Sequence, residues 1–160
     1  MGSLEQDLSA HNIIGLDTAP FIYLWERHGR YLALSEAVFL HLKEPDVQGV
    51  TSLITLIEAC VLPRRQGRLD LVQEYERALL HSRQVETLDI DTALARRAID
   101  LRSEHNLRVP DALQIAAALE AGATAFVTND RRLQGVQDRA FEAKLGGQGE
   151  ENALWVGLMA

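Results

Sequence analysis

The chain has 160 residues and a single cysteine, carries a formal net charge of −7 and is 47% hydrophobic. This length fits one domain with a real core, and the acidic balance argues against a basic protein that binds nucleic acid without sequence preference. One cysteine excludes an intrachain disulfide or a thiolate cluster. Because there is no apolar run of about 18 residues and no secretory signal, we expect a cytoplasmic protein without a membrane span.

Short apolar runs alternate with helical patterns over residues 13–160, which we interpret as one domain behind an N-terminal tail of residues 1–12. In chain order the pattern predicts a strand Ile13–Asp17, helices Phe21–Arg27 and Leu32–Leu42, a strand Val47–Thr51, helices Leu53–Leu62 and Leu69–Ser82, a strand Val85–Ile90, a helix from Thr92 to about His105, a helix Ala112–Ala121, and strands Ala123–Val127 and Leu154–Leu158. Ser52 suits an N-cap, and Pro63 is expected to end the helix that follows. This alternation predicts a parallel sheet covered on both faces.

Glu58 lies in the apolar helix Leu53–Leu62 and is the one acid between Asp46 and Asp70. A helix of this composition is expected to be buried over much of its surface, where an unpaired carboxylate is costly. A basic partner or a metal cation would compensate the charge. The alternative is that Glu58 points outward from a partly exposed face.

Three aspartates occupy strand ends or helix starts. Asp17 ends the first predicted strand, Asp111 follows Pro110 at the start of a helix, and Asp130 follows the strand Ala123–Val127. Each suits the first turn of a helix, where a carboxylate accepts from free N–H groups and favours the helix dipole. Taken singly, capping is the simpler interpretation of each.

Together with Glu58, these aspartates indicate more than capping. A parallel sheet brings its sites to the carboxyl ends of the strands, and carboxylates that meet there repel one another unless a cation neutralises them. Mg²⁺ prefers a few carboxylate oxygens, water and substrate phosphate, and two ions about 3.5–4 Å apart stabilise phosphodiester cleavage. If the acids converge, a divalent metal site is the simplest interpretation.

Four segments resemble the PIN-domain family, especially the VapC toxins of toxin–antitoxin pairs. They are Ile14–Thr18 with Phe21–Tyr23, Thr51–Glu58, Val109–Ala118 and Phe126–Leu133. Each segment is weak alone, but the four occur in the right order and span nearly the whole chain. The resemblance implies a three-layer α/β/α fold with a central, mainly parallel sheet, and an endoribonuclease that uses Mg²⁺ or Mn²⁺.

Carried onto this sequence, the resemblance implies an acidic metal site and a supporting hydroxyl. The site residues are Asp17, Glu58, Asp111 and Asp130, and the hydroxyl is that of Thr128. The resemblance also implies cleavage that leaves 5′-phosphate and 3′-hydroxyl ends, a small antitoxin partner and a homodimer. Many relatives have Ser or Asn two residues after the first acid, where this chain has Ala19. Loss of that polar contact would alter metal affinity or rate.

Two groups of arginines are candidates for contacts with RNA phosphates. They are Arg64, Arg65 and Arg68 after the Glu58 helix, and Arg131 and Arg132 after Asp130. A solvated surface turn is the simpler interpretation of each group.

Three other functions stay open. A haloacid-dehalogenase-like phosphatase also uses a strand-end aspartate, but its Asp-x-Asp pattern would need an acid where this chain has Ala19. A non-catalytic module with a PIN fold would not need all four acids. A stand-alone housekeeping nuclease differs from a toxin in its neighbouring gene, which for a toxin encodes a short antitoxin.

Overall fold

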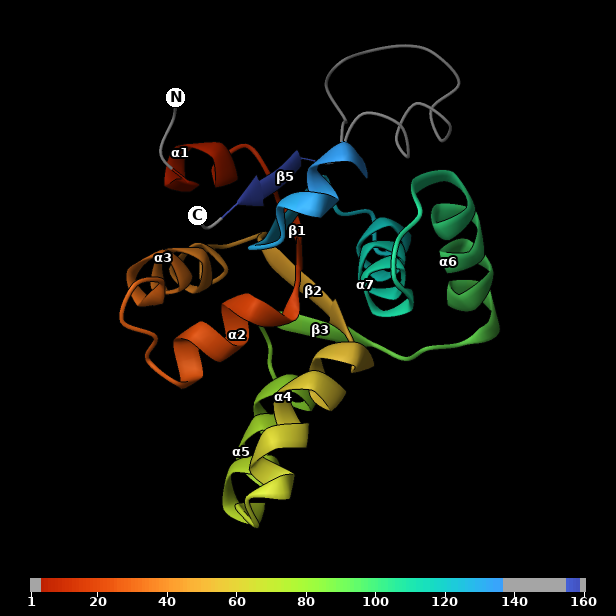
Figure 1. The fold of residues 1–160 in the computed structure, drawn as a ribbon. Helices are drawn as coiled ribbons and strands as arrows, with labels where there is room; N and C mark the ends of the chain where they lie inside the picture. The colour runs from red at the N-terminus through yellow and green to blue at the C-terminus, as the bar shows by residue number, and fades with distance from the viewer. Residues whose placement is uncertain (1–3, 137–154, 159–160) are drawn as a thin grey trace.

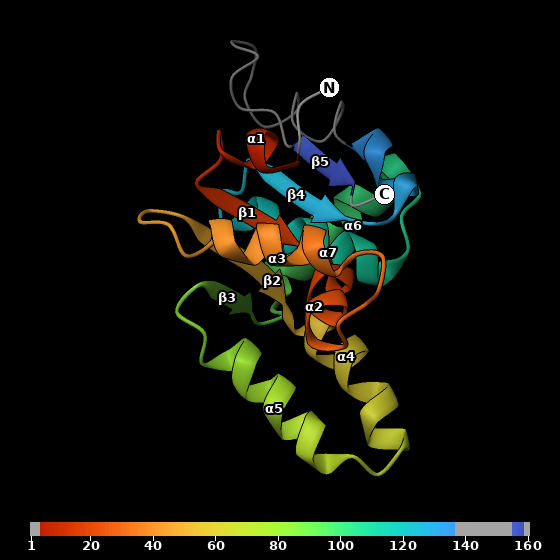
Figure 2. The same cartoon turned by 90° about the vertical axis from the view of Figure 1, so that its left-hand side faces the viewer.

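A computed structural model describes residues 4–136 and 155–158. At its centre is a sheet of five strands in the order β3-β2-β1-β4-β5, in which every neighbouring pair is parallel. The strands are β1 (Ile13–Leu16), β2 (Gln48–Ser52), β3 (Val85–Leu88), β4 (Ala125–Thr128) and β5 (Trp155–Leu158). Each short apolar run predicted as a strand is therefore part of one sheet, and its order is visible in Figure 2.

Helices cover both faces of this sheet (Figures 1 and 2). One face carries α1 (Leu4–Leu8), α2 (Thr18–Trp25) and α3 (Leu32–His41), and the other carries α6 (Thr92–His105) and α7 (Val109–Glu120). Two further helices, α4 (Leu53–Arg65) and α5 (Leu69–Leu80), form a hairpin that projects from the body, and a short 3₁₀ helix, η1 (Arg131–Val136), follows β4. The predicted three-layer α/β/α fold is confirmed.

The core consists of two apolar clusters, one on each side of the sheet. Ile14 and Leu16 of β1 face the cluster under α1 to α3, whereas Phe126 of β4 faces the cluster under α6 and α7. Gly15 points toward α7, and a Cβ atom there would lie 2.5 Å from the Cβ of Ala118. The missing side chain at Gly15 therefore lets α7 pack closely on the middle strand.

Two sequence predictions differ from the structure. Pro63 does not end its helix, because α4 continues to Arg65, and the Gln66 N–H still donates to the Leu62 carbonyl at 3.1 Å. Proline removes one donor from a helix, and the buried Pro63 ring packs where the helix is already two residues from its end. The segment expected as a tail also contains α1, whose Leu8 is fully buried in the core.

None of the helices in the described part of the chain is both long enough and apolar enough to cross a bilayer.

Candidate metal centre at the carboxyl edge of the sheet

The parallel register brings the ends of three strands to one edge. Leu16 of β1 pairs with Val127 of β4, and the Asp17 N–H continues this ladder by donating to the Val127 carbonyl at 3.0 Å. Asp17 and Thr128 therefore end neighbouring strands side by side. Ser52 ends β2 on the other side of β1, so α2, α4 and the segment after β4 all start from the same edge.

Asp17 lies at the centre of this edge and is mostly buried. Its Oδ2 accepts a hydrogen bond from the Thr128 hydroxyl at 2.6 Å, and its Oδ1 accepts from the Thr18 N–H at 2.9 Å, which caps α2. Burial raises the pKa of Asp17 from 3.8 to about 6, the two hydrogen bonds oppose this rise, and the charges of Asp111 and Glu58 add to it. The predicted capping role of Asp17 is confirmed, and the same carboxylate lies at the edge where the metal site is predicted.

Asp111 is buried in the first turn of α7. Its Oδ2 accepts a hydrogen bond from Nε of Arg108 at 3.0 Å. The charge of Asp111 also raises the pKa of Asp17, so the two carboxylates repel each other electrostatically. Residues 94 positions apart in the chain therefore share one electrostatic environment.

Asp130 lies next to Asp111 but is held by cations. Its carboxylate forms a salt bridge with the Arg132 guanidinium, and its Oδ2 lies 3.9 Å from Nη2 of Arg108. The Arg132 hydrogen bonds hold the pKa of Asp130 below its ordinary value, although partial burial opposes this effect. The Asp130 N–H donates to the Thr128 hydroxyl at 3.1 Å, so Thr128 links Asp130 to Asp17.

Glu58 reaches the site from α4, but not for the reason that its sequence suggested. The residue is exposed, and so are its apolar neighbours Ile57, Val61 and Leu62, at 55%, 40% and 54%. The expectation that α4 is buried over much of its surface is therefore wrong, because α4 belongs to the projecting hairpin. Glu58 nevertheless turns one oxygen inward, and its Oε1 accepts a hydrogen bond from the Thr18 hydroxyl at 2.8 Å.

A buried network of hydrogen bonds holds the Thr18 hydroxyl that donates to Glu58. Gln114 of α7 donates from Nε2 to the Thr18 hydroxyl at 3.2 Å and to the Thr55 hydroxyl at 2.8 Å, while its Oε1 accepts from the Ser52 hydroxyl at 2.7 Å. The Thr51 hydroxyl extends the network to the Leu16 carbonyl at 3.0 Å. The network joins α2, α4, α7 and two strands beneath the acids.

The sequence analysis did not identify Thr18, Gln114 or Arg108 as functional. Gln114 carried a usable signal, since it is the one polar residue in the run from Ala112 to Leu119, and a polar side chain among buried neighbours needs partners. Arg108 carried no comparable signal, because its role depends on the distance between Asp111 and Asp130 in space. Ala19, which stands where many relatives have Ser or Asn, offers no polar side chain. At the start of α2 the hydroxyl of Thr18 makes the polar contacts instead.

The two predicted arginine groups lie in different places. Arg64 and Arg65 end α4 and Arg68 precedes α5, so all three lie at the turn of the hairpin that projects from the body (Figure 1), and Arg68 forms a salt bridge with Asp70 at 2.8 Å. Arg131 and Arg132 are exposed at the start of η1. Only the second group adjoins an acid of the site, through the contact of Arg132 with Asp130.

The donor chemistry of this edge fits a hard divalent cation. Asp17 offers a buried carboxylate whose neighbours Asp111 and Glu58 are also acidic, and Mg²⁺ typically takes one or two carboxylates and keeps several waters. Within residues 4–136 and 155–158, no three acidic, histidine or cysteine side chains are grouped closely enough to hold one ion between them. Among the acids, Asp111 has the larger charge effect on Asp17, ahead of Glu58, so Asp17 and Asp111 are the first candidates to hold an ion.

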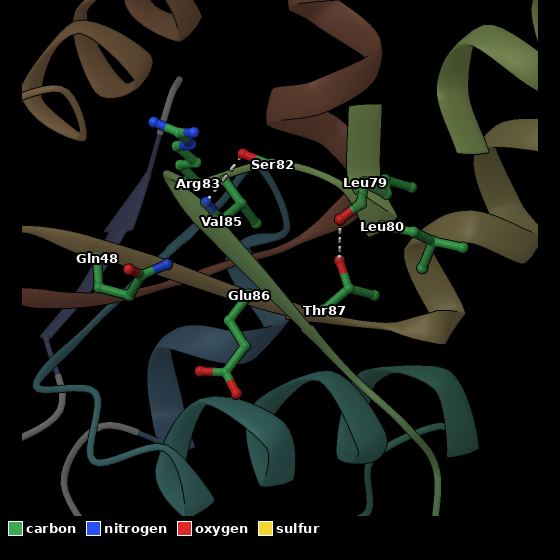
Figure 3. A pocket seen from close by; sticks show the side chains of 8 residues that line it. All are labelled: Gln48, Leu79, Leu80, Ser82, Arg83, Val85, Glu86 and Thr87. Carbon is green, nitrogen blue, oxygen red and sulfur yellow. Dashed lines mark hydrogen bonds between the residues drawn. The ribbon is translucent and has the colours of Figure 1, made fainter. Parts of the chain in front are cut away.

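A pocket of about 430 Å³ lies elsewhere, beside the edge strand β3 (Figure 3). It is lined by Gln48, Leu79, Leu80, Ser82, Arg83, Val85, Glu86 and Thr87. The protein itself uses the hydroxyls there, since Thr87 donates to the Leu79 carbonyl and the Ser82 oxygen accepts from two backbone N–H groups. None of the four acids lines this pocket, so it is separate from the candidate metal centre.

Comparison with known proteins agrees with this fold. The model of the PIN domain family matches residues 14–138. Among solved structures, a toxin–antitoxin complex from Klebsiella pneumoniae is similar at 24% identity and a TM-score of 0.59, with 78% of this chain and 92% of that chain covered. VapBC2 from Rickettsia felis, bound to a DNA fragment from their promoter, is similar at 16% identity and a TM-score of 0.58, with 90% and 98% covered. No curated protein matches.

The fold thus defines an α/β protein with a parallel sheet between two layers of helices. The family match extends over more than half of the residues, so the chain belongs to the PIN-domain family, whose members are generally nucleases. The resemblance derived from the four sequence segments is confirmed at the level of the family and of the fold.

Proposed function

We propose that this protein is a metal-dependent endoribonuclease that uses Mg²⁺ or Mn²⁺, and that it is the toxin of a toxin–antitoxin pair. The observation that carries the proposal is the mostly buried Asp17 carboxylate at the carboxyl edge of the sheet, whose pKa is raised by burial and by the charges of Asp111 and Glu58. Structural stability does not explain this arrangement, because burial and like charges both disfavour the ionised form of Asp17. Selection for binding a cation does explain it.

In the proposed reaction, a water oxygen forms a bond to the scissile phosphorus and the bond from phosphorus to the 3′ oxygen breaks. The water proton passes to solvent, and the 3′ oxygen takes a proton to become a hydroxyl. A divalent ion supplies the positive charge that activates water and offsets charge on the leaving oxygen. Asp17 and Asp111 would hold it, Thr128 and the Thr18 N–H fix the orientation of Asp17, and the Thr18 hydroxyl fixes Glu58.

The proposed partner is a small antitoxin protein. The two solved structures compared above are toxin–antitoxin complexes. On this chain, the exposed Ile57, Val61 and Leu62 of α4 lie within one turn of Glu58. Exposed apolar residues grouped beside polar ones are typical of protein-binding surfaces. We expect the product of a short neighbouring gene to copurify with the chain and to inhibit it.

The direct test is cleavage of labelled single-stranded RNA by the purified protein. We expect cleavage with Mg²⁺ or Mn²⁺, none with EDTA, and much slower cleavage of DNA of the same sequence. Asp17→Asn should lower the rate at least a hundredfold, whereas Asp70→Asn, at the exposed tip of the hairpin, should not change it. Equal rates for wild type and Asp17→Asn would refute the site assignment.

Two further results separate the alternatives. Absence of RNA cleavage, together with a melting temperature unaffected by Mn²⁺, would favour a non-catalytic module. RNA cleavage by a chain that binds no neighbouring gene product would favour a stand-alone nuclease. The proposed homodimer is tested by light scattering, which should give twice the mass of one 17.8 kDa chain.

A further inference from the structure

Arg108 occupies a position that helix stability does not explain. It is the N-cap residue of α7, where its side chain makes no capping hydrogen bond. A positive charge at a helix N-terminus opposes the helix dipole, and Ser, Thr, Asp and Asn are the residues that stabilise this position. The salt bridge joins the exposed Arg108 guanidinium to the largely buried Asp111 carboxylate and offsets its charge, but its hydrogen bond uses only one of the five N–H donors of the guanidinium. Another role is therefore expected for this side chain.

The guanidinium of Arg108 lies on the solvent side of the acidic edge. The Arg108 side chain is 63% exposed, whereas that of Asp111 is 12% exposed. The Nε atom of Arg108 donates a hydrogen bond to Asp111, but Nη2 of Arg108 is 3.9 Å from Oδ2 of Asp130, which is beyond hydrogen-bonding distance. A guanidinium has five N–H donors in a planar fork. Arg108 therefore keeps donors that face outward beside two acids from different elements.

Arg132 differs from Arg108 in this respect. Both Arg132 Nε and Nη2 donate to the carboxylate of Asp130, so the planar fork of Arg132 is already matched by a carboxylate. RNA brings its own negative charge to an edge that already carries four acids, and cations must offset the repulsion. Arg108 and Arg132 are equally exposed, at 63%, but of these two arginines it is Arg108 that keeps a free pair of donors for a phosphate group.

We propose that Arg108 binds a phosphate of the RNA at the candidate metal centre, next to Asp111. This inference rests on the proposed ribonuclease function and adds a substrate-binding residue to it. The planar fork accepts two phosphate oxygens at once, and this contact places the backbone of the RNA over Asp17 and Asp111. A lysine at this position keeps the charge but loses the two-point contact.

The test measures binding of a fluorescent single-stranded RNA in EDTA, where the proposed reaction does not run, at several salt concentrations. Arg108→Gln should weaken the binding about tenfold and reduce the slope of log K against log salt by about 0.7, the value for one phosphate contact. Arg108→Lys should keep the slope and show intermediate affinity. Arg83→Gln is the matched control, because Arg83 is exposed at the opposite edge of the sheet, before β3 (Figure 3).

Mn²⁺ affinity separates substrate binding from a purely structural role. Arg108→Gln should bind Mn²⁺ at least as tightly as wild type, because a neighbouring positive charge is removed. Loss of both Mn²⁺ and RNA binding would mean that Arg108 only holds the acids in place, and would overturn the inference. If wild type cleaves RNA but Arg108→Gln has an unchanged slope, the inference fails while the proposed function stands. If wild type neither binds nor cleaves RNA, both fail.

Discussion

Asp17→Asn is expected to stabilise the protein at neutral pH without divalent ions, although it should abolish cleavage. Burial raises the pKa of Asp17 from 3.8 to about 6, so ionised Asp17 destabilises the fold by about 3 kcal/mol at about 1.4 kcal/mol per pH unit. Asparagine has the same shape without the charge. It cannot accept from both Thr128 and the Thr18 N–H as Asp17 does, and this loss costs about 1 kcal/mol. A net gain of about 2 kcal/mol follows.

The gain depends on pH in a defined direction. Since the pKa of Asp17 is higher in the folded than in the unfolded protein, the folded state binds more protons between pH 3.8 and about 6. The stability of the wild type therefore falls as the pH rises through this window. The charge contribution of about 3 kcal/mol at pH 7.5 shrinks to about 1 kcal/mol at pH 4.5, where the lost hydrogen bond cancels it.

The assay is urea unfolding followed by circular dichroism, in EDTA, at pH 7.5 and pH 4.5. Asp70→Asn is the control, because the Arg68 hydrogen bond holds the pKa of the exposed Asp70 below its ordinary value and removal of its charge should bring no gain. The reasoning is refuted if Asp17→Asn is no more stable than wild type at pH 7.5, or if its gain is the same at both pH values.

Three other substitutions test the support of the site. Gln114→Leu should lower the free energy of unfolding by about 2–4 kcal/mol, because buried hydroxyls lose their partner, and an unchanged urea midpoint would contradict this. Gly15→Ala should lower the free energy of unfolding by about 1–3 kcal/mol through overpacking. Gly29→Ala is the control, because a Cβ at Gly29 meets open space. Equal free energies of unfolding for the two variants would exclude the close-packing argument. Thr128→Val should raise the pKa of Asp17 further, since the Thr128 hydrogen bond lowers it; a carboxyl NMR titration that shows a lower pKa would count against this.

Local signals in the sequence predicted the elements well. The apolar runs ending at Asp17 and Thr128 are strands, and Asp91 caps α6, which ends at His105 as expected. The failure at Pro63 has a physical reason, because a proline near the end of a helix removes a single donor and packing on α5 maintains the last turns. Local patterns are therefore reliable where one segment decides its own conformation.

The composition of a helix did not show what covers it. The apolar residues of α4 indicated burial, yet Ile57, Val61 and Leu62 are exposed because α4 belongs to a projecting hairpin. The burial argument for Glu58 thus fails and the alternative of a partly exposed face holds, although one oxygen of Glu58 accepts a hydrogen bond from Thr18. Whether an apolar helix lies in the core or on a surface depends on segments far away in the chain.

From the sequence alone, a metal site could be predicted only on the condition that the acids lie close together in the fold. Asp17 and Asp111 interact electrostatically because β1 ends at the carboxyl edge of the sheet and α7, which begins with Asp111 in its first turn, packs on Gly15 of β1. Arg108 illustrates the same limit, since its relation to Asp130 exists only in the folded chain. Gln114 was open to prediction by the rule that a buried polar group needs partners.

The most direct test of the central claim is a crystal structure of the wild-type protein soaked in Mn²⁺, with anomalous scattering used to locate the ion. We expect a peak bound by carboxylate oxygens of Asp17 and Asp111, and no peak at this place in Asp17→Asn. Wild-type crystals that bind Mn²⁺ only at other positions, or an ion retained unchanged in Asp17→Asn, would contradict the metal centre and the nuclease mechanism built on it.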